Sequence, residues 1–101
     1  MFTEAHLEAY KNHLEASYKN QGGYVESGRK IHFKKGSKYV KVTWGVNGPE
    51  SAYAFIVVQE GQKFPVGTIL KAASWAAPAN NFGRGNVMNP ESYKNHHWSG
   101  L

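Results

Sequence analysis

Cysteine is absent from the chain, which excludes disulfide bonds, thiolate catalysis and cysteine-based zinc sites. Aspartate is absent as well, so a Ser-His-acid triad would need a glutamate, and no nucleophile-elbow motif is present to build one. The five histidines form neither an HxxxH nor an HExxH pair, the spacings that place two metal ligands on one helix face. We therefore expect no enzymatic activity, no metal site and no cofactor.

Long apolar stretches are also missing. No run approaches the roughly 18 to 20 apolar residues that a membrane-spanning helix needs. The N-terminal residues lack the basic region and the apolar core of a secretion signal. Together with the missing cysteine, these absences suit a cytosolic protein, and no membrane partner is expected.

The residues that are present have the composition of a globular protein. Hydrophobic residues make up 41% of the chain and aromatic residues 14%. A length of 101 residues predicts a single domain over residues 1–101 with one modest core. The formal net charge of +5 favours anionic partners, although a charge of this size also serves solubility alone.

The N-terminal segment carries the pattern of an amphipathic helix. Its hydrophobic side chains recur at spacings of three and four residues and so share one face: Leu7, Tyr10, Leu14 and Tyr18. Thr3 is suited to the N-cap position of this helix.

A basic β-hairpin is predicted over residues 29–44. Gly36-Ser37 suits a two-residue type II′ turn, because glycine supplies the positive φ angle that this turn needs. The turn would pair Phe33 with Val40 on one face of the sheet, and it would place Lys30, Lys34 and Lys41 on the other face together with His32 and Tyr39.

Two further strands are expected. Residues 51–59 are apolar on both faces, which is typical of a central strand, and residues 68–72 form a shorter strand. The chain then has the character of a loop until Asn89, which can cap a short helix with Pro90 at its first position. The predicted fold class is α+β, an antiparallel sheet of about four strands with an N-terminal helix packed on one face and a short C-terminal helix.

The outer face of the hairpin is a candidate site for single-stranded nucleic acid or RNA, formed by Lys30, His32, Lys34, Tyr39 and Lys41. Lysines contact phosphates and an interleaved aromatic ring stacks on a base, so the pattern is typical of such faces. The alternative is a solvated face on which lysines discourage edge-to-edge pairing of strands. No RNP, helix-turn-helix or KH motif decides between the two.

A second candidate is an anion-binding or structural loop formed by Gly83, Arg84, Gly85 and Asn86. The glycines allow backbone N–H groups to converge on an anion while the guanidinium adds a positive charge. Such a site would suit a protein that sequesters a nucleotide. In the alternative interpretation the glycines only permit the turns, and Arg84 and the asparagines bond to the protein itself.

A third candidate is a protein interface anchored by aromatic side chains, for which the candidates are Trp75, Phe82, Tyr93 and Trp98. Trp and Tyr dominate the residues that contribute most to protein–protein binding. A module of this kind would be an inhibitor of a host or defence protein, or a virion component. For Trp75 the sequence also allows a structural role, in which it seals the open end of the sheet together with the small residues that follow.

Residues 67–79, GTILKAASWAAPA, followed by Arg84-Gly85-Asn86, resemble the core of a group of small bacteriophage proteins of unknown function. The similarity extends over residues 38–87 and leaves out the N-terminal helix and the C-terminal tail. The resemblance implies a bacteriophage protein that acts in the host cytoplasm or in the virion. It implies no catalytic residue.

Overall fold

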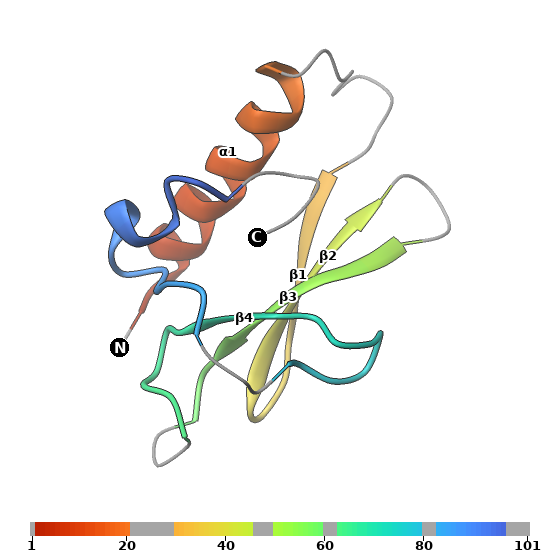
Figure 1. Cartoon of the computed structure of the whole chain (residues 1–101), viewed down its shortest axis with the longest axis vertical. Coiled ribbons are helices and arrows are strands. Elements are labelled where there is room, and N and C mark those ends of the chain that lie inside the picture. Colours follow the sequence, from red (N-terminus) through yellow and green to blue (C-terminus); the bar gives the residue numbers. More distant parts are fainter. Residues whose placement is uncertain (1, 21–29, 46–49, 60–62, 80–82, 97–101) are drawn as a thin grey trace.

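The computed structural model describes residues 2–20, 30–45, 50–59, 63–79 and 83–96. In chain order its elements are α1 (Glu4–Asn20), β1 (Lys30–Lys35), β2 (Tyr39–Gly45), β3 (Glu50–Val57), β4 (Ile69–Lys71) and the 3-10 helix η2 (Pro90–Tyr93). The four strands form one antiparallel sheet in the order β1-β2-β3-β4 (Figure 1). The predicted α+β class is confirmed, with a single 3-10 turn in place of the short C-terminal helix.

Helix α1 begins with a cap in which a histidine takes part. The carbonyl oxygen of Thr3 accepts hydrogen bonds from the amides of His6 and Leu7 at 3.0 and 3.2 Å. In return, the amide of Thr3 donates to Nδ1 of His6 at 2.9 Å. His6 thus occupies the position that a Glu or Gln holds in a capping box. The predicted stripe is buried from Leu7 to Leu14, whereas the side chain of Tyr18 lies outside the described part of the chain.

The β1–β2 hairpin has a different register from the predicted one. Phe33 lies opposite Val42, two residues further along than expected. The amide of Gly36 donates to the carbonyl of Tyr39 at 2.9 Å, so the loop consists of residues 37–38, and Gly36 is not among the described glycines with a positive φ angle. The predicted type II′ turn is therefore wrong. Because the shift is an even number of residues, every side chain keeps its predicted face.

Burial of Trp44 accounts for this register. The shift places Trp44 opposite Ile31, and the two side chains are 8% and 2% exposed. Register is strongly specified where one face of a strand is buried, since a slip changes which large side chains meet. The preference of glycine for a type II′ turn is the weaker influence here.

A β-bulge re-aims one tyrosine of the central strand β3. The register between β2 and β3 shifts between Val42 and Thr43, which leaves Tyr53 as an extra residue on β3. Tyr53 consequently packs against the core beneath α1 and shares a side-chain hydrogen bond with Tyr10. Simple alternation along β3 would have placed it on the opposite face.

The chain after β4 folds back along the edge of the sheet, although the sequence predicted a loop from Ala73 onward. Antiparallel bridges join residues 72 and 78 and residues 68 and 86. The amide of Ala79 donates to the carbonyl of Lys71 at 2.7 Å, and the amide of Arg84 donates to the carbonyl of Ile69 at the same distance. The outer edge of β4 is thereby paired, which removes one of the two open edges of the sheet.

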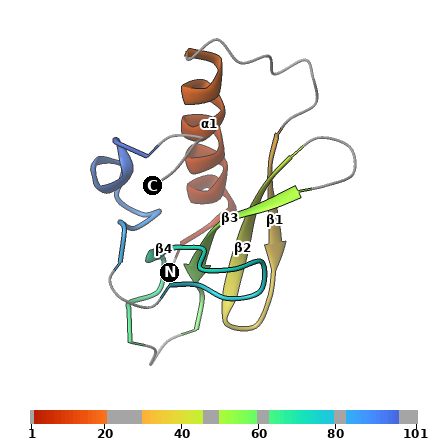
Figure 2. The same cartoon turned by 45° about the vertical axis from the view of Figure 1, so that its right-hand side comes forward.

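Both faces of the sheet carry buried side chains. The main core lies between α1 and one face, here called the inner face. On the opposite, outer face a smaller set is also buried: Phe55, Val57 and Leu70 are 4%, 1% and 1% exposed, and none belongs to the main core. Residues 72–79, here called the outer turn, reach across the strands beside this set (Figures 1 and 2). The sheet is thus covered by α1 on one side and partly by the outer turn on the other.

Candidate nucleic-acid interface

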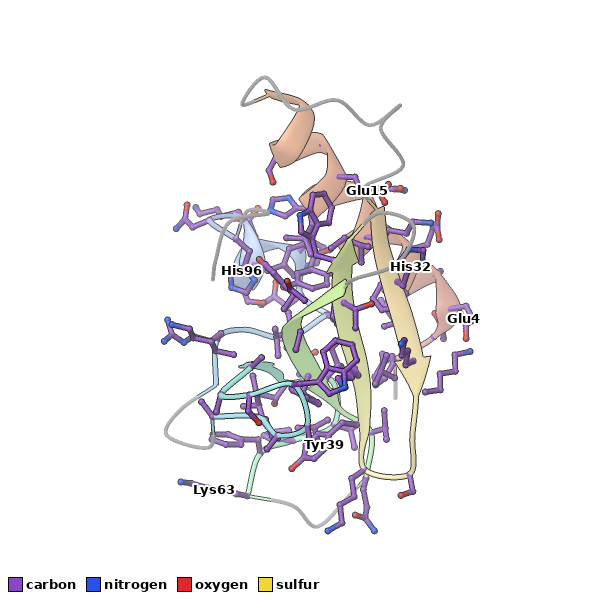
Figure 3. The ribbon with its side chains drawn as sticks, turned by 90° about the vertical axis from the view of Figure 1, so that its right-hand side faces the viewer. Glu4, Glu15, His32, Tyr39, Lys63 and His96 are labelled. Atoms are coloured by element: carbon purple, nitrogen blue, oxygen red, sulfur yellow. The ribbon has the colours of Figure 1, made fainter. Side chains whose placement is uncertain are left out.

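The basic hairpin residues line up on the outer face as the alternation predicted. Lys34 and Lys41 lie directly opposite each other on β1 and β2, and His32 lies opposite Thr43. Figure 3 labels His32 on β1. His32 and Lys34 are exposed, and Lys41 is half-buried. The backbone of Lys30 pairs with Gly45 at the end of β1, but its side chain lies outside the described part.

Trp75, at the tip of the outer turn, lies against these lysines. Its ring centroid is 3.5 Å from Nζ of Lys41 and 5.3 Å from Nζ of Lys34, both within the range of a cation–π contact. The ring remains 48% exposed, an unusual degree for so large an apolar side chain. The structure therefore combines a residue predicted for a protein interface with two residues predicted for nucleic acid.

Small residues allow this approach. The outer turn is closed by its own backbone, with the amides of Ala73 and Ser74 both donating to the carbonyl of Ala77, at 3.0 and 3.1 Å. Trp75 is the only large side chain among residues 72–77. The sequence signal for this role is one tryptophan set among alanine and serine. Without the fold, that signal does not say which strand the ring meets.

Tyr39 lies beneath the lysines of the outer face, and its ring is less exposed than that of Trp75. It is half-buried and packs edge-on against Phe55, with ring centroids 5.8 Å apart. Lys41 also lies over Phe55, at 5.9 Å from the ring centroid. Tyr39 and Phe55 thus form an aromatic floor beneath Lys41, and Trp75 supplies the more exposed ring on this face.

The described acidic side chains lie on other parts of the molecule. Glu4, Glu8 and Glu15 belong to α1, and Glu91 belongs to η2. Figure 3 shows Glu4 and Glu15 beside β1, where Glu4 pairs with Lys35, and Glu15 accepts a hydrogen bond from the amide of Ile31 at 3.1 Å. The described carboxylates therefore lie on the helical side, together with Lys11, Lys35 and Lys94, whereas Lys34 and Lys41 lie on the outer face.

Backbone amides of the loop at residues 83–86 form hydrogen bonds within the protein. The amide of Arg84 donates to Ile69, and the amide of Asn86 donates to Oγ of Ser92 at 2.8 Å. Gly85 has a φ angle of 139°, and a Cβ at this position would lie 2.8 Å from the carbonyl oxygen of Ser92. Because these two amides are bound within the protein, they do not converge on an anion. The structural alternative accounts for their geometry.

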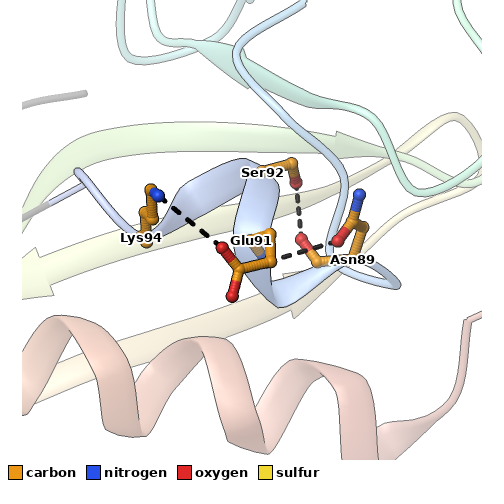
Figure 4. Close-up of polar contacts among 4 residues, drawn as sticks. All are labelled: Asn89, Glu91, Ser92 and Lys94. Atoms are coloured by element: carbon orange, nitrogen blue, oxygen red, sulfur yellow. Dashed lines mark hydrogen bonds and ion pairs between the residues drawn. The ribbon is translucent and has the colours of Figure 1, made fainter.

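Asn86 and Asn89 hold this loop to η2. Oδ1 of Asn86 accepts from the amide of Met88 at 2.9 Å, and its Nδ2 donates to the carbonyl of Val66 at 3.2 Å. Asn89 caps η2, as predicted, with its Oδ1 accepting from the amide of Glu91 at 3.2 Å (Figure 4). Gly83 is exposed, and a Cβ there would come within 2.8 Å of a Thr68 methyl group.

The other predicted interface aromatics do not form a surface in the described structure. Tyr93 is 3% exposed and packs edge-on against Tyr10 at 4.8 Å between ring centroids, so its prediction as a surface anchor is wrong. Tyr93 is the buried residue of η2, and its side chain belongs to the core beside α1. Phe82 and Trp98 lie outside the described residues.

A buried polar network joins η2 to α1 and was not predicted. The Tyr10 hydroxyl lies 2.9 Å from Nδ1 of His96, whose Nε2 lies 2.7 Å from the carbonyl oxygen of Arg84. Since a carbonyl only accepts, Nε2 carries a proton and donates. Burial raises the pKa of Tyr10 well above its usual value, and that of Tyr53 as well. The sequence signal was weak, because a histidine near the C-terminus resembles a surface residue, and His96 is followed directly by His97.

The described residues contain no cluster of His, Asp or Glu side chains that could hold a metal ion. They also include no helix long and apolar enough to span a membrane. A family model described as "Family of unknown function (DUF7717)" matches residues 1–101, which includes α1 and the C-terminal tail as well as residues 38–87. No match was found among curated proteins or solved structures.

Proposed function

We propose that this chain, which belongs to the DUF7717 family of unknown function, binds single-stranded nucleic acid, DNA or RNA, through the outer face of its sheet. The observation that carries the proposal is the position of the half-exposed Trp75 ring against Lys34 and Lys41. Single-strand binding sites combine cations that follow the phosphates with aromatic rings on which bases stack. Here both kinds of group occur on one face.

Charge supports the same assignment. The chain has a net charge of +5, and its described carboxylates lie on α1 and η2. A polyanion that approaches the outer face therefore meets His32, Lys34 and Lys41 before any described acid.

The biological setting is proposed from the sequence resemblance. Residues 38–87 resemble small bacteriophage proteins, which would place this protein in the host cytoplasm or in the virion as an accessory protein without catalytic activity. Nucleic acid is abundant in both places. A binding face without an active site suits such an accessory role.

A protein partner is the second candidate. Trp75 is 48% exposed, and tryptophan is the side chain most enriched among residues that contribute most to protein interfaces. An acidic protein would use the same lysines. The two candidates differ in their response to a competing oligonucleotide. Binding of a protein partner would depend on Trp75 and would be little affected by added oligonucleotide. Binding of nucleic acid would be blocked by added oligonucleotide.

The proposal is tested by charge reversal with a matched control. Labelled single-stranded DNA and RNA are titrated with the wild type, with Lys34→Glu/Lys41→Glu, and with Lys11→Glu/Lys94→Glu, which alters α1 and the residue after η2. Both double variants reduce the net charge equally. We expect binding to be lost in the first and largely retained in the second. Equal losses of affinity in the two double variants would mean that binding depends on net charge and not on the outer face. No binding by the wild type at low salt would refute the proposal.

A further inference from the structure

The Trp75 ring already has a cationic partner in the free protein. Nζ of Lys41 lies 3.5 Å from the ring centroid and Nζ of Lys34 lies 5.3 Å from it. An ammonium group within about 6 Å of a ring centroid is attracted by the negative face of the ring. The two cations that would contact phosphates are therefore the same groups that contact the ring.

A bound phosphate changes this arrangement. Hydrogen bonds between an ammonium and a phosphate are charge-assisted and stronger than bonds between neutral groups. As phosphates draw the two lysines away, the ring loses its cation–π contacts and keeps an apolar surface that faces water. The loss is offset only if the ligand also supplies a flat group to stack on Trp75.

We infer that the unit recognised at this site is an unpaired base flanked by phosphates of the same strand, taken up in exchange for the cation–π contacts of Trp75. The inference rests on the proposed function and specifies its ligand. A polyanion without bases engages the lysines but leaves the ring uncovered. A duplex keeps its bases stacked and paired, so it presents no open base face to the ring.

Trp75 is suited to this exchange because its turn does not depend on the lysines for its shape. The backbone bonds of residues 73–77 and the bridge between residues 72 and 78 close the turn independently. The aromatic floor of Tyr39 and Phe55 lies beneath Lys41. The ring can therefore change partners while its backbone stays in place.

The experiment compares strands that differ only in their bases. Fluorescently labelled oligothymidylate, an abasic strand of equal length and a duplex are titrated at one low salt concentration. We expect the wild type to bind the abasic strand about 5- to 150-fold more weakly than oligothymidylate, the loss that corresponds to one stacked base. In Trp75→Leu this ratio should fall to near one, and in Trp75→Phe it should be largely restored because an aromatic ring is retained.

Each outcome decides a separate point. If the abasic strand and the duplex bind as tightly as oligothymidylate, the inference is wrong while the lysine face remains a nucleic-acid site. An unchanged base preference in Trp75→Leu, with its fold verified by circular dichroism, also overturns the inference. If no strand binds to the wild type, both the inference and the proposed function fail.

Discussion

Single side chains hold the C-terminal part of the chain, and Asn86 is the clearest case. Its side chain bonds to the backbone on both sides, to the amide of Met88 and to the carbonyl of Val66. It also lies close above Gly67, whose φ angle is 93° and where a Cβ would come within 2.6 Å of Oδ1 of Asn86. Asn86, for which the sequence left open anion binding or a structural role in the loop, thus fixes the return of the chain along β4.

Replacing Asn86 should therefore destabilise the fold. Asn86→Ala removes both side-chain hydrogen bonds and leaves backbone groups without their partner, which is expected to cost about 1 to 3 kcal/mol of unfolding free energy. Urea unfolding measures the change. The matched control is Asn12→Ala on the exposed face of α1, where the change should stay within about 0.5 kcal/mol. Equal effects of the two variants would contradict this account of Asn86.

The buried tyrosines predict how stability depends on pH. Burial raises the pKa of Tyr10 and Tyr53 in the folded protein, whereas tyrosine in an unfolded chain ionises near pH 10. A raised folded pKa means that the stability is complete below about pH 10 and is lost as the pH rises further. The unfolding free energy should fall by about 1.4 kcal/mol per pH unit for each such tyrosine.

Tyr53→Phe tests this dependence, because it removes one of the three described tyrosines, Tyr10, Tyr53 and Tyr93, whose pKa burial raises. Urea unfolding between pH 8 and pH 11 should show a shallower loss of stability for the variant than for the wild type. Only the slope matters, since the lost hydrogen bond to Tyr10 shifts the whole curve. Parallel curves for the two proteins would show that Tyr53 does not titrate in this way.

Among the elements, the outer turn has a proposed role in binding, and we expect it to contribute less to the unfolding free energy than the buried strands. Trp75 is 48% exposed, and the backbone of the turn closes without it. Phe55, beneath it on β3, is 4% exposed. The two aromatic side chains should therefore differ in what they contribute to stability.

We expect Trp75→Ala to lower the unfolding free energy by about 1 to 3 kcal/mol, because only about half of this side chain is buried. Phe55→Ala should cost about 3 to 5 kcal/mol, the usual result of truncating a buried phenylalanine. Chemical unfolding of both variants provides the measurement. A loss in Trp75→Ala as large as that in Phe55→Ala would make Trp75 a core residue, as one sequence interpretation had it.

The elements also show which features of the fold could be predicted from local sequence patterns. The stripe from Leu7 to Leu14 and the alternation along β1 and β2 predicted which faces are buried, because both depend only on local periodicity. The hairpin register and the bulge at Tyr53 depend on which large side chains meet across strands. The placement of Trp75 against Lys41 requires both the sheet and the outer turn, so no local pattern contained it.

At the scale of the whole molecule, the described carboxylates lie on the helical side and not on the basic outer face. Helix α1 and η2 carry the described carboxylates on one side of the sheet, and β1 and β2 present His32, Lys34 and Lys41 on the other. The sequence predicted the basic face because lysines alternate along the hairpin. It did not predict that a tryptophan from beyond β4 would join them, since that contact links residues more than thirty positions apart.

The salt dependence of binding tests the central claim most directly. For single strands, log affinity falls as log salt rises, and the magnitude of this slope is about 0.7 for each phosphate contacted. If Lys34 and Lys41 each contact a phosphate, Lys34→Met and Lys41→Met should each reduce the wild-type slope by about 0.7, and Lys11→Met should leave it unchanged. Wild-type slopes in both outer-face variants, or no dependence on salt at all, would contradict the account.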